Sequence, residues 1–207
     1  MVIRNLSDFF EEVFINYRFF AIILGLSLPS MVFGKVVFAF LILFALILVF
    51  CLRPWEEILN ELVIQAKSPL GKLIFFTFIM WLPSVFISSQ PIRSFEAIMR
   101  TLAFIAVASV FCSSLKANPP LLDLSLQAFT GMAFISVIFT LSTMMFIPEL
   151  FWVLRLKGWQ SEEIFTSLKG FSNLTVMVLP LLILVANRLS GFWKIVAIIT
   201  FFGFLCV

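Results

Sequence analysis

The sequence predicts an all-α protein, a polytopic bundle of about six or seven transmembrane helices with short interfacial amphipathic helices. Composition is the first reason: 62% of the 207 residues are apolar and only 12% are charged, whereas soluble domains are about 45–50% apolar and about 25% charged. The second is patterning, because the apolar residues form unbroken blocks and not the alternation of a membrane β-barrel. Lipid is therefore the expected solvent.

Charged residues mark the ends of the expected spans. A helix that crosses the hydrocarbon core needs about 17–25 residues, and two of the apolar stretches reach this length only if Arg100 and Lys194 extend toward the headgroups. The first stretch contains Pro29 and is either a full span, which we favour, or one arm of a hairpin. The predicted spans are 19–34, 36–52, 73–92, 97–115, 124–148, 170–187 and 192–207.

The N-terminus has an amphipathic pattern. Leu6, Phe10 and Val13 fall on one helical face, and Asp8 and Glu12 fall on the other. We predict an interfacial helix over 1–18, followed by a single transmembrane domain over 19–207. The alternative is that this segment simply extends the first span.

A second amphipathic segment follows the span 36–52. It runs from Pro54, which suits a first helical turn, to the break at 68–71. One face is apolar, and the opposite face is expected to be polar, with Glu56, Glu57, Asn60 and Glu61. This pattern predicts a connector at the membrane surface.

Loop charges favour a cytoplasmic N-terminus in the inner membrane. With seven spans, one set of loops carries eight basic residues: Arg4, Arg18, Arg53, Lys67, Lys72, Lys116, Arg188 and Lys194. The other set carries six: Lys35, Arg93, Arg100, Arg155, Lys157 and Lys169. The last apolar stretch is short and has no polar anchor after it, so we expect the chain to be a truncated form of a longer protein.

Several kinds of chemistry find no support. The chain has no histidine, and Cys51, Cys112 and Cys206 are far apart, so neither a metal site nor a cofactor is predicted. Net charge is only +3 and is dispersed, which argues against nucleic acid as a partner. Asp and Glu are almost absent from the spans, which disfavours ion-coupled transport.

Basic residues on the predicted external side form the candidate site. Arg93, Glu96 and Arg100 share a helical face, so the carboxylate could hold both guanidinium groups, whose forked donors suit phosphate. Lys169 lies at a span entrance on the same side. The alternative is that these residues, like Trp152 and Trp159 in the loop before Lys169, only anchor the protein at the headgroups. No catalytic residue is identified.

Two motifs resemble bacterial O-antigen ligases and O-antigen polymerases. The first is Trp81-Leu82-Pro83 followed by Ser88-Ser89-Gln90-Pro91 at the exit of the third span. The second is Lys169-Gly170-Phe171-Ser172-Asn173 leading into Val178-Leu179-Pro180, although the family commonly has Arg where Lys169 stands.

The resemblance implies metal-independent transfer of a glycan from undecaprenyl pyrophosphate to lipid A-core or to another glycan. It assigns Arg93, Arg100 and Lys169 to part of a pyrophosphate site, because basic side chains stabilise the leaving group. Family members have about twice as many spans and a large external loop, so we expect this chain alone to lack ligase activity. Membrane lipid is the other expected partner.

Two other classes of function stay open. A transport or channel subunit is suggested by hydroxyl residues within the spans, which serve equally in helix packing. They are Ser109, Ser113, Ser136, Thr140, Ser142 and Thr143. A non-catalytic membrane scaffold is the other alternative.

Overall fold

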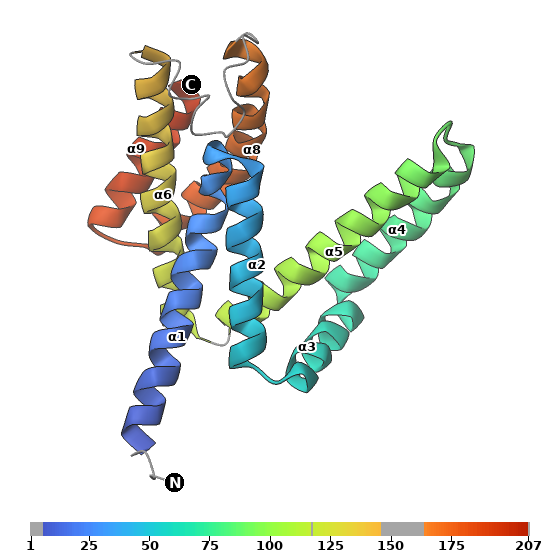
Figure 1. The fold of residues 1–207 in the computed structure, drawn as a ribbon, viewed down its shortest axis with the longest axis horizontal. Coiled ribbons are helices and arrows are strands. Elements are labelled where there is room, and N and C mark those ends of the chain that lie inside the picture. The colour runs from blue at the N-terminus through green and yellow to red at the C-terminus, as the bar shows by residue number, and fades with distance from the viewer. Residues whose placement is uncertain (1–5, 117, 146–163, 207) are drawn as a thin grey trace. The chain divides into compact units, whose positions relative to one another are not determined.

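The computed structural model describes residues 6–116, 118–145 and 164–206, and the regular elements in these ranges are all helical (Figure 1). The predicted all-α class is therefore confirmed for the described residues. The elements are α1 (Leu6–Ser27), the 3-10 helix η1 (Pro29–Phe33), α2 (Lys35–Leu52), α3 (Trp55–Lys67), α4 (Pro69–Ile87), α5 (Pro91–Lys116), α6 (Pro119–Met145), α8 (Ile164–Arg188) and α9 (Phe192–Cys206).

Three of the described helices are long and apolar enough to cross a membrane: α4, α5 and α6. The number rises to four if the bent pair formed by α2 and α3 is one span. The helices α8 and α9 are apolar as well, but their described apolar parts are shorter. A count of six or seven spans thus stays a prediction.

The N-terminal segment does not separate from the first apolar stretch. The helix α1 continues through residue 18 without a break, because no Gly or Pro interrupts the sequence from Leu6 to Leu24. The interfacial helix predicted over 1–18 is therefore not a separate element in the described part of the chain. The helix ends only before Pro29, where the five residues of η1 take over.

The chain divides into two compact units, where the sequence predicted a single transmembrane domain. One unit comprises Met1–Leu48 with Pro119–Val207, and the other comprises Val49–Asn118. The physical reason is visible in the core of the first unit, where α1 packs along α6, and α6 also contacts η1, α8 and α9. Its buried apolar side chains include Leu126, Phe129, Ala133, Leu174, Val178, Leu182 and Phe204.

The contact between α1 and α6 depends on a glycine. A Cβ built on Gly25 would lie under 3.0 Å from the Ser125 carbonyl oxygen and 2.9 Å from the Cβ of Ala128. Small residues allow helix backbones to approach closely where apolar side chains alone give no preference for a partner helix. Gly25 therefore sets the distance between α1 and α6.

We predict that Gly25→Ala destabilises the protein by about 1–3 kcal/mol, because the backbone of α6 must move to admit the methyl group. Gly131→Ala, also in this unit, is the matched control. Its Cβ would meet only the Trp193 ring at 3.8 Å, an ordinary contact. Thermal unfolding in detergent should show a lower midpoint for the first variant only. Equal midpoints would show that the backbones can separate at no cost.

Candidate lipid-binding groove

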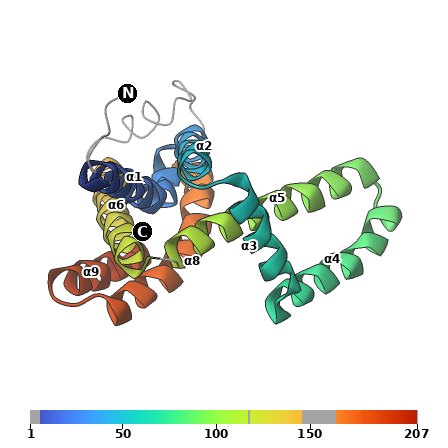
Figure 2. The ribbon, with the colours of Figure 1, turned by 90° about the horizontal axis from the view of Figure 1, so that it is seen from below.

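The second unit consists mainly of α3, α4 and α5, each of which contacts the other two. Ser68 sets the corner between α3 and α4: its hydroxyl donates to the Gln65 carbonyl at 2.6 Å and accepts from the Gly71 amide at 3.1 Å. This is an N-cap followed by Pro69 in the first turn, as the break predicted at 68–71 requires. In Figure 2, α3 crosses near one end of the α4–α5 pair, and a turn joins the pair at the other end.

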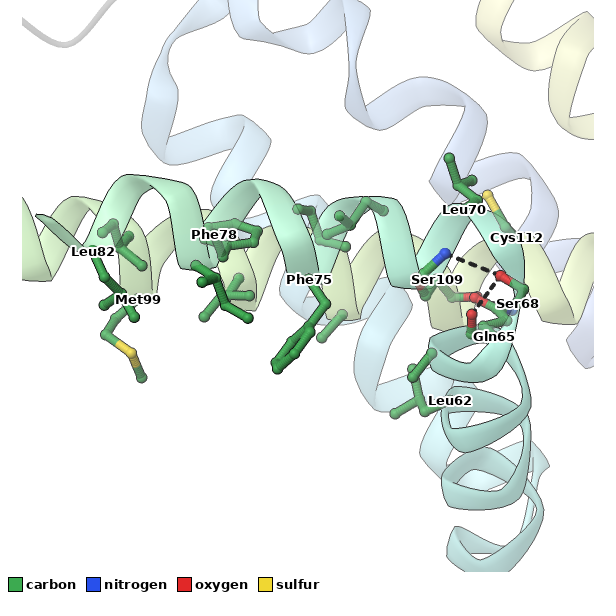
Figure 3. A pocket seen from close by; sticks show the side chains of 18 of the residues that line it. Leu62, Gln65, Ser68, Leu70, Phe75, Phe78, Leu82, Met99, Ser109 and Cys112 are labelled. Atoms are coloured by element: carbon green, nitrogen blue, oxygen red, sulfur yellow. Dashed lines mark hydrogen bonds between the residues drawn. The ribbon is translucent and has the colours of Figure 1, made fainter. Parts of the chain in front are cut away.

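A groove of about 700 Å³ lies between these three helices. This is within the range of small-molecule sites, about 300–1,000 Å³. Most of the side chains around it are apolar, and Figure 3 shows Leu62, Phe75, Phe78, Leu82 and Met99 along it. Such a surface suits a hydrocarbon chain.

The polar lining residues gather at one end of the groove. They come from the last turns of α3 and α5 and from the N-cap of α4, and they are Gln65, Ser68, Ser109 and Lys116. The opposite end, next to the turn between α4 and α5, is lined by Leu82, Phe95 and Met99. The groove is thus amphipathic along its length.

Hydrogen bonds attach α3 to α5 at the polar end. The side-chain amide of Gln65 donates to the Ser113 hydroxyl and, at 3.4 Å, to the Ser109 carbonyl. The Ser113 hydroxyl in turn donates to the carbonyl of Ser109 at 2.9 Å. These bonds hold Gln65 at the groove wall.

An ion pair next to these bonds strengthens the attachment. Arg53 donates through both terminal nitrogens to the carboxylate of Glu61, at 2.7 and 3.0 Å, and lies 3.5 Å from Glu57. A further bond, at 3.4 Å, reaches Ser114 on α5. The Arg53 side chain is 12% exposed and that of Glu61 is 35% exposed, so water is largely excluded from the guanidinium but reaches the carboxylate.

Glu61 has a contact that the sequence pattern did not predict. The pattern placed it on the polar side of α3, yet it joins Arg53 close to α5. Its hydrogen bond to Arg53 lowers the pKa of the Glu61 carboxyl, and burial only partly opposes this effect. Glu61 therefore keeps Arg53 neutralised near neutral pH.

Arg93 and Arg100 lie on α5 but not in the groove. Both are exposed, and neither is among the residues that line the cavity. At about 100° per residue, their face of α5 is nearly opposite the face that carries Phe95, Ile98 and Leu102. Glu96 forms an ion pair with Arg100; within the described part of the chain it has no such contact with Arg93.

The start of α5 is ordered by hydroxyl groups. The Ser88 hydroxyl accepts from the Gln90 amide at 3.1 Å, and Ser94 and Ser88 share a hydrogen bond of 2.9 Å. Arg93 therefore projects from a fixed first turn, where backbone N–H groups favour anions.

Lys169 lies in α8, which belongs to the other compact unit. Its side chain is outside the described residues, as are Arg155, Lys157, Trp152 and Trp159. The convergence of Arg93, Arg100 and Lys169 on one site thus stays a prediction.

The hydroxyl residues of α6 are bonded to backbone carbonyls. Thr140 donates to the Ser136 carbonyl at 2.8 Å, and Thr143 donates to that of Phe139 at 2.9 Å. Ser136 bonds within its helix and to the Pro29 carbonyl of η1, at 3.1 Å. All three residues are buried, whereas Ser142 is exposed. The buried three therefore serve helix packing, and this arrangement gives no support to an aqueous path.

Metal chemistry finds no donor set in the described residues, which contain no group of three or more His, Cys, Asp or Glu side chains able to hold an ion. The three cysteines are free and exposed, and Cys112 lines the groove.

Comparisons with known proteins give no relative. No family model matches the chain, and no curated protein or solved structure is significantly similar to it. The resemblance to O-antigen ligases therefore depends on the short motifs alone.

The sequence pattern did not reveal the groove. The one signal was Gln65 on an otherwise apolar edge of α3, with Ser109 and Ser113 one turn apart on α5. Their meeting depends on the angle between helices, which spacing within one helix cannot give.

We predict that Glu61→Gln lowers stability by about 1–2 kcal/mol, because Arg53 loses its charged partner; partial exposure of Glu61 keeps the loss below that of a fully buried pair. In wild type, the folded-state pKa of Glu61 lies below the ordinary value of about 4.3 for a glutamate. The stabilisation from the Glu61–Arg53 pair is therefore lost as the pH falls through this lowered pKa. Thermal unfolding followed by tryptophan fluorescence from pH 7 to 3 should therefore show a smaller acid effect in the variant.

Glu56→Gln is the control, since Glu56 is exposed on the same helix. The ion pair has no structural role if both variants unfold at the wild-type temperature throughout this pH range.

Proposed function

We propose that the protein is an O-antigen ligase-like protein of the bacterial inner membrane that binds a glycan linked to undecaprenyl pyrophosphate. In this proposal it crosses the membrane six or seven times from a cytoplasmic N-terminus, and the turn between α4 and α5 is external. The apolar helices support membrane insertion, because such surfaces need lipid as solvent. Lipid A-core is the proposed acceptor in the ligase case.

The observation that carries the proposal is the arrangement at the start of α5. Arg93 is exposed on a helix start that hydrogen bonds hold in place, and Arg100 follows two turns later on the same face. A guanidinium group can donate two parallel hydrogen bonds to the oxygens of a phosphate. The free N–H groups at the start of a helix add to the attraction of an anion. A pyrophosphate at the membrane surface matches this arrangement of donors.

This site is a binding site in the proposal, and no residue is assigned to bond cleavage. The carboxylate of Glu96 holds Arg100 in place without neutralising Arg93 by direct contact in the described structure. Basic groups at this position would stabilise the charge that develops on a pyrophosphate leaving group. The hydroxyl bonding of α6 favours this function over a transport or channel subunit.

The test is binding of undecaprenyl pyrophosphate to the purified chain in nanodiscs, with undecaprenol as the uncharged comparison. We expect the double variant Arg93→Gln, Arg100→Gln to bind undecaprenyl pyrophosphate at least 10-fold more weakly, since each charge-assisted bond contributes about 1.5–3 kcal/mol. The double variant Arg93→Lys, Arg100→Lys should have an affinity between those of wild type and the glutamine variant, because lysine keeps the charge but lacks the forked donors of a guanidinium group.

The double variant Arg188→Gln, Lys194→Gln removes the same charge outside both proposed sites, so it is the charge-matched control and should bind like wild type. The proposal fails if the arginine variants bind undecaprenyl pyrophosphate as tightly as wild type, or if undecaprenol binds equally well.

A further inference from the structure

The polar end of the groove has an excess of positive charge. Lys116 lines the groove, and the neighbours of two further lining residues, Ser68 and Gly71, are Lys67 and Lys72. All three lysines are exposed, and none forms an ion pair within the described ranges. The nearby acidic groups Glu57 and Glu61 are engaged with Arg53. Lys116 therefore brings to this end of the groove a positive charge that an anionic group can neutralise.

The remainder of the groove excludes a polar ligand. Beyond Gln65 and Ser109 the walls are formed by Ile74, Phe78 and Ile105 among other apolar side chains. A ligand that fills the groove must thus be a hydrocarbon chain with an anionic group at one end only. A soluble anion would leave the apolar length empty, and an uncharged lipid would leave the lysines without a partner.

We propose that this groove binds one acyl chain of an anionic phospholipid, with its phosphate at Lys116 and with Lys67 and Lys72 around the headgroup. The clustering of lysines at this end matches the cytoplasmic side by the positive-inside rule. Anionic headgroups there attract basic residues by about 1 kcal/mol each. The bound lipid fastens α3 against α4 and α5.

This site is separate from the proposed pyrophosphate site. The lysines are at the ends of α3 and α5 and at the start of α4, whereas Arg93 and Arg100 project from the other face of α5, near its start. A polyprenyl phosphate is the alternative occupant of the groove, and its chain is the same kind of apolar ligand. The two lipids differ in headgroup and can be compared directly.

The test is native mass spectrometry of the purified chain with phosphatidylglycerol, phosphatidylcholine and undecaprenyl phosphate. Wild type should retain phosphatidylglycerol at least 5-fold better than phosphatidylcholine with the same acyl chains. Lys116→Gln should lose this preference, and Lys116→Arg should keep it. The variant Arg93→Gln, Arg100→Gln, which lacks the proposed pyrophosphate site, should retain phosphatidylglycerol better than undecaprenyl phosphate. The variant Arg93→Gln, Arg100→Gln should bind phosphatidylglycerol like wild type, whatever it does to undecaprenyl pyrophosphate.

A second measurement locates the acyl chain. Cys112 lines the groove, so phosphatidylglycerol should slow its reaction with N-ethylmaleimide, whereas Cys51 and Cys206, which do not line the groove, should react at unchanged rates. Ala106→Phe should remove the protection, because the added ring fills the groove without changing any charge.

The proposal is overturned if Lys116→Gln keeps the headgroup preference, if Cys112 reacts equally fast with and without phosphatidylglycerol, or if the variant Arg93→Gln, Arg100→Gln retains undecaprenyl phosphate best. If Lys116→Gln unfolds, as its thermal midpoint would show, the protection of Cys112 in wild type decides the matter.

Discussion

Every buried polar side chain in this apolar chain must find its partner in the protein, and this constraint shapes both compact units. Leaving a buried polar group without a hydrogen bond costs several kcal/mol in a hydrocarbon environment. Among the described residues, no buried side-chain nitrogen or oxygen lacks a partner. The buried hydroxyl groups of α6 use backbone carbonyls, and Arg53 uses Glu61 and Ser114. In the second unit the polar contacts from α3 to α5 therefore fix which helices meet, whereas the α6 hydroxyl groups bond mainly within their own helix.

The two units satisfy this constraint in different ways. In the first unit, close backbone approach at Gly25 and interlocking apolar side chains hold α1, α6, α8 and α9 together. In the second unit, side-chain bonds from α3 reach α5, and a small buried apolar cluster joins α4 and α5 at Phe78, Val85 and Ile98. Because the apolar packing is less extensive, a groove stays open between the helices. The hydrogen bonds between α3 and α5 fix the geometry of its polar end. A lipid chain in this space would replace the missing apolar contacts.

The basic residues of the second unit fall into two groups. Arg53 has a structural role, because it forms ion pairs with Glu57 and Glu61 and donates a hydrogen bond to Ser114. Arg93, Lys67, Lys72 and Lys116 are exposed and stand where a ligand phosphate can approach. The distinction matters for function, because the charge of a largely buried, paired guanidinium such as Arg53 is not available to an anionic ligand, whereas an exposed charge is. Arg100 belongs with the exposed group, since both it and its partner Glu96 are exposed. The pyrophosphate proposal depends on Arg93 and Arg100, and the phospholipid proposal depends on the lysines.

The sequence by itself determined the helical class, the apolar segments and most breaks between them. Pro69 and Pro91 begin helices as their backbone chemistry dictates, and the apolar blocks could satisfy their backbone in lipid only as helices. Only the tertiary structure decided that Glu61 pairs with Arg53, and that α3, α4 and α5 enclose a groove from which Arg93 and Arg100 project away. The physical reason is that periodicity defines the faces of one helix, whereas a groove depends on the angles at which helices cross. Those angles are set by a few contacts, such as Gly25 with Ser125 and Gln65 with Ser113, whose partners lie far apart in the chain.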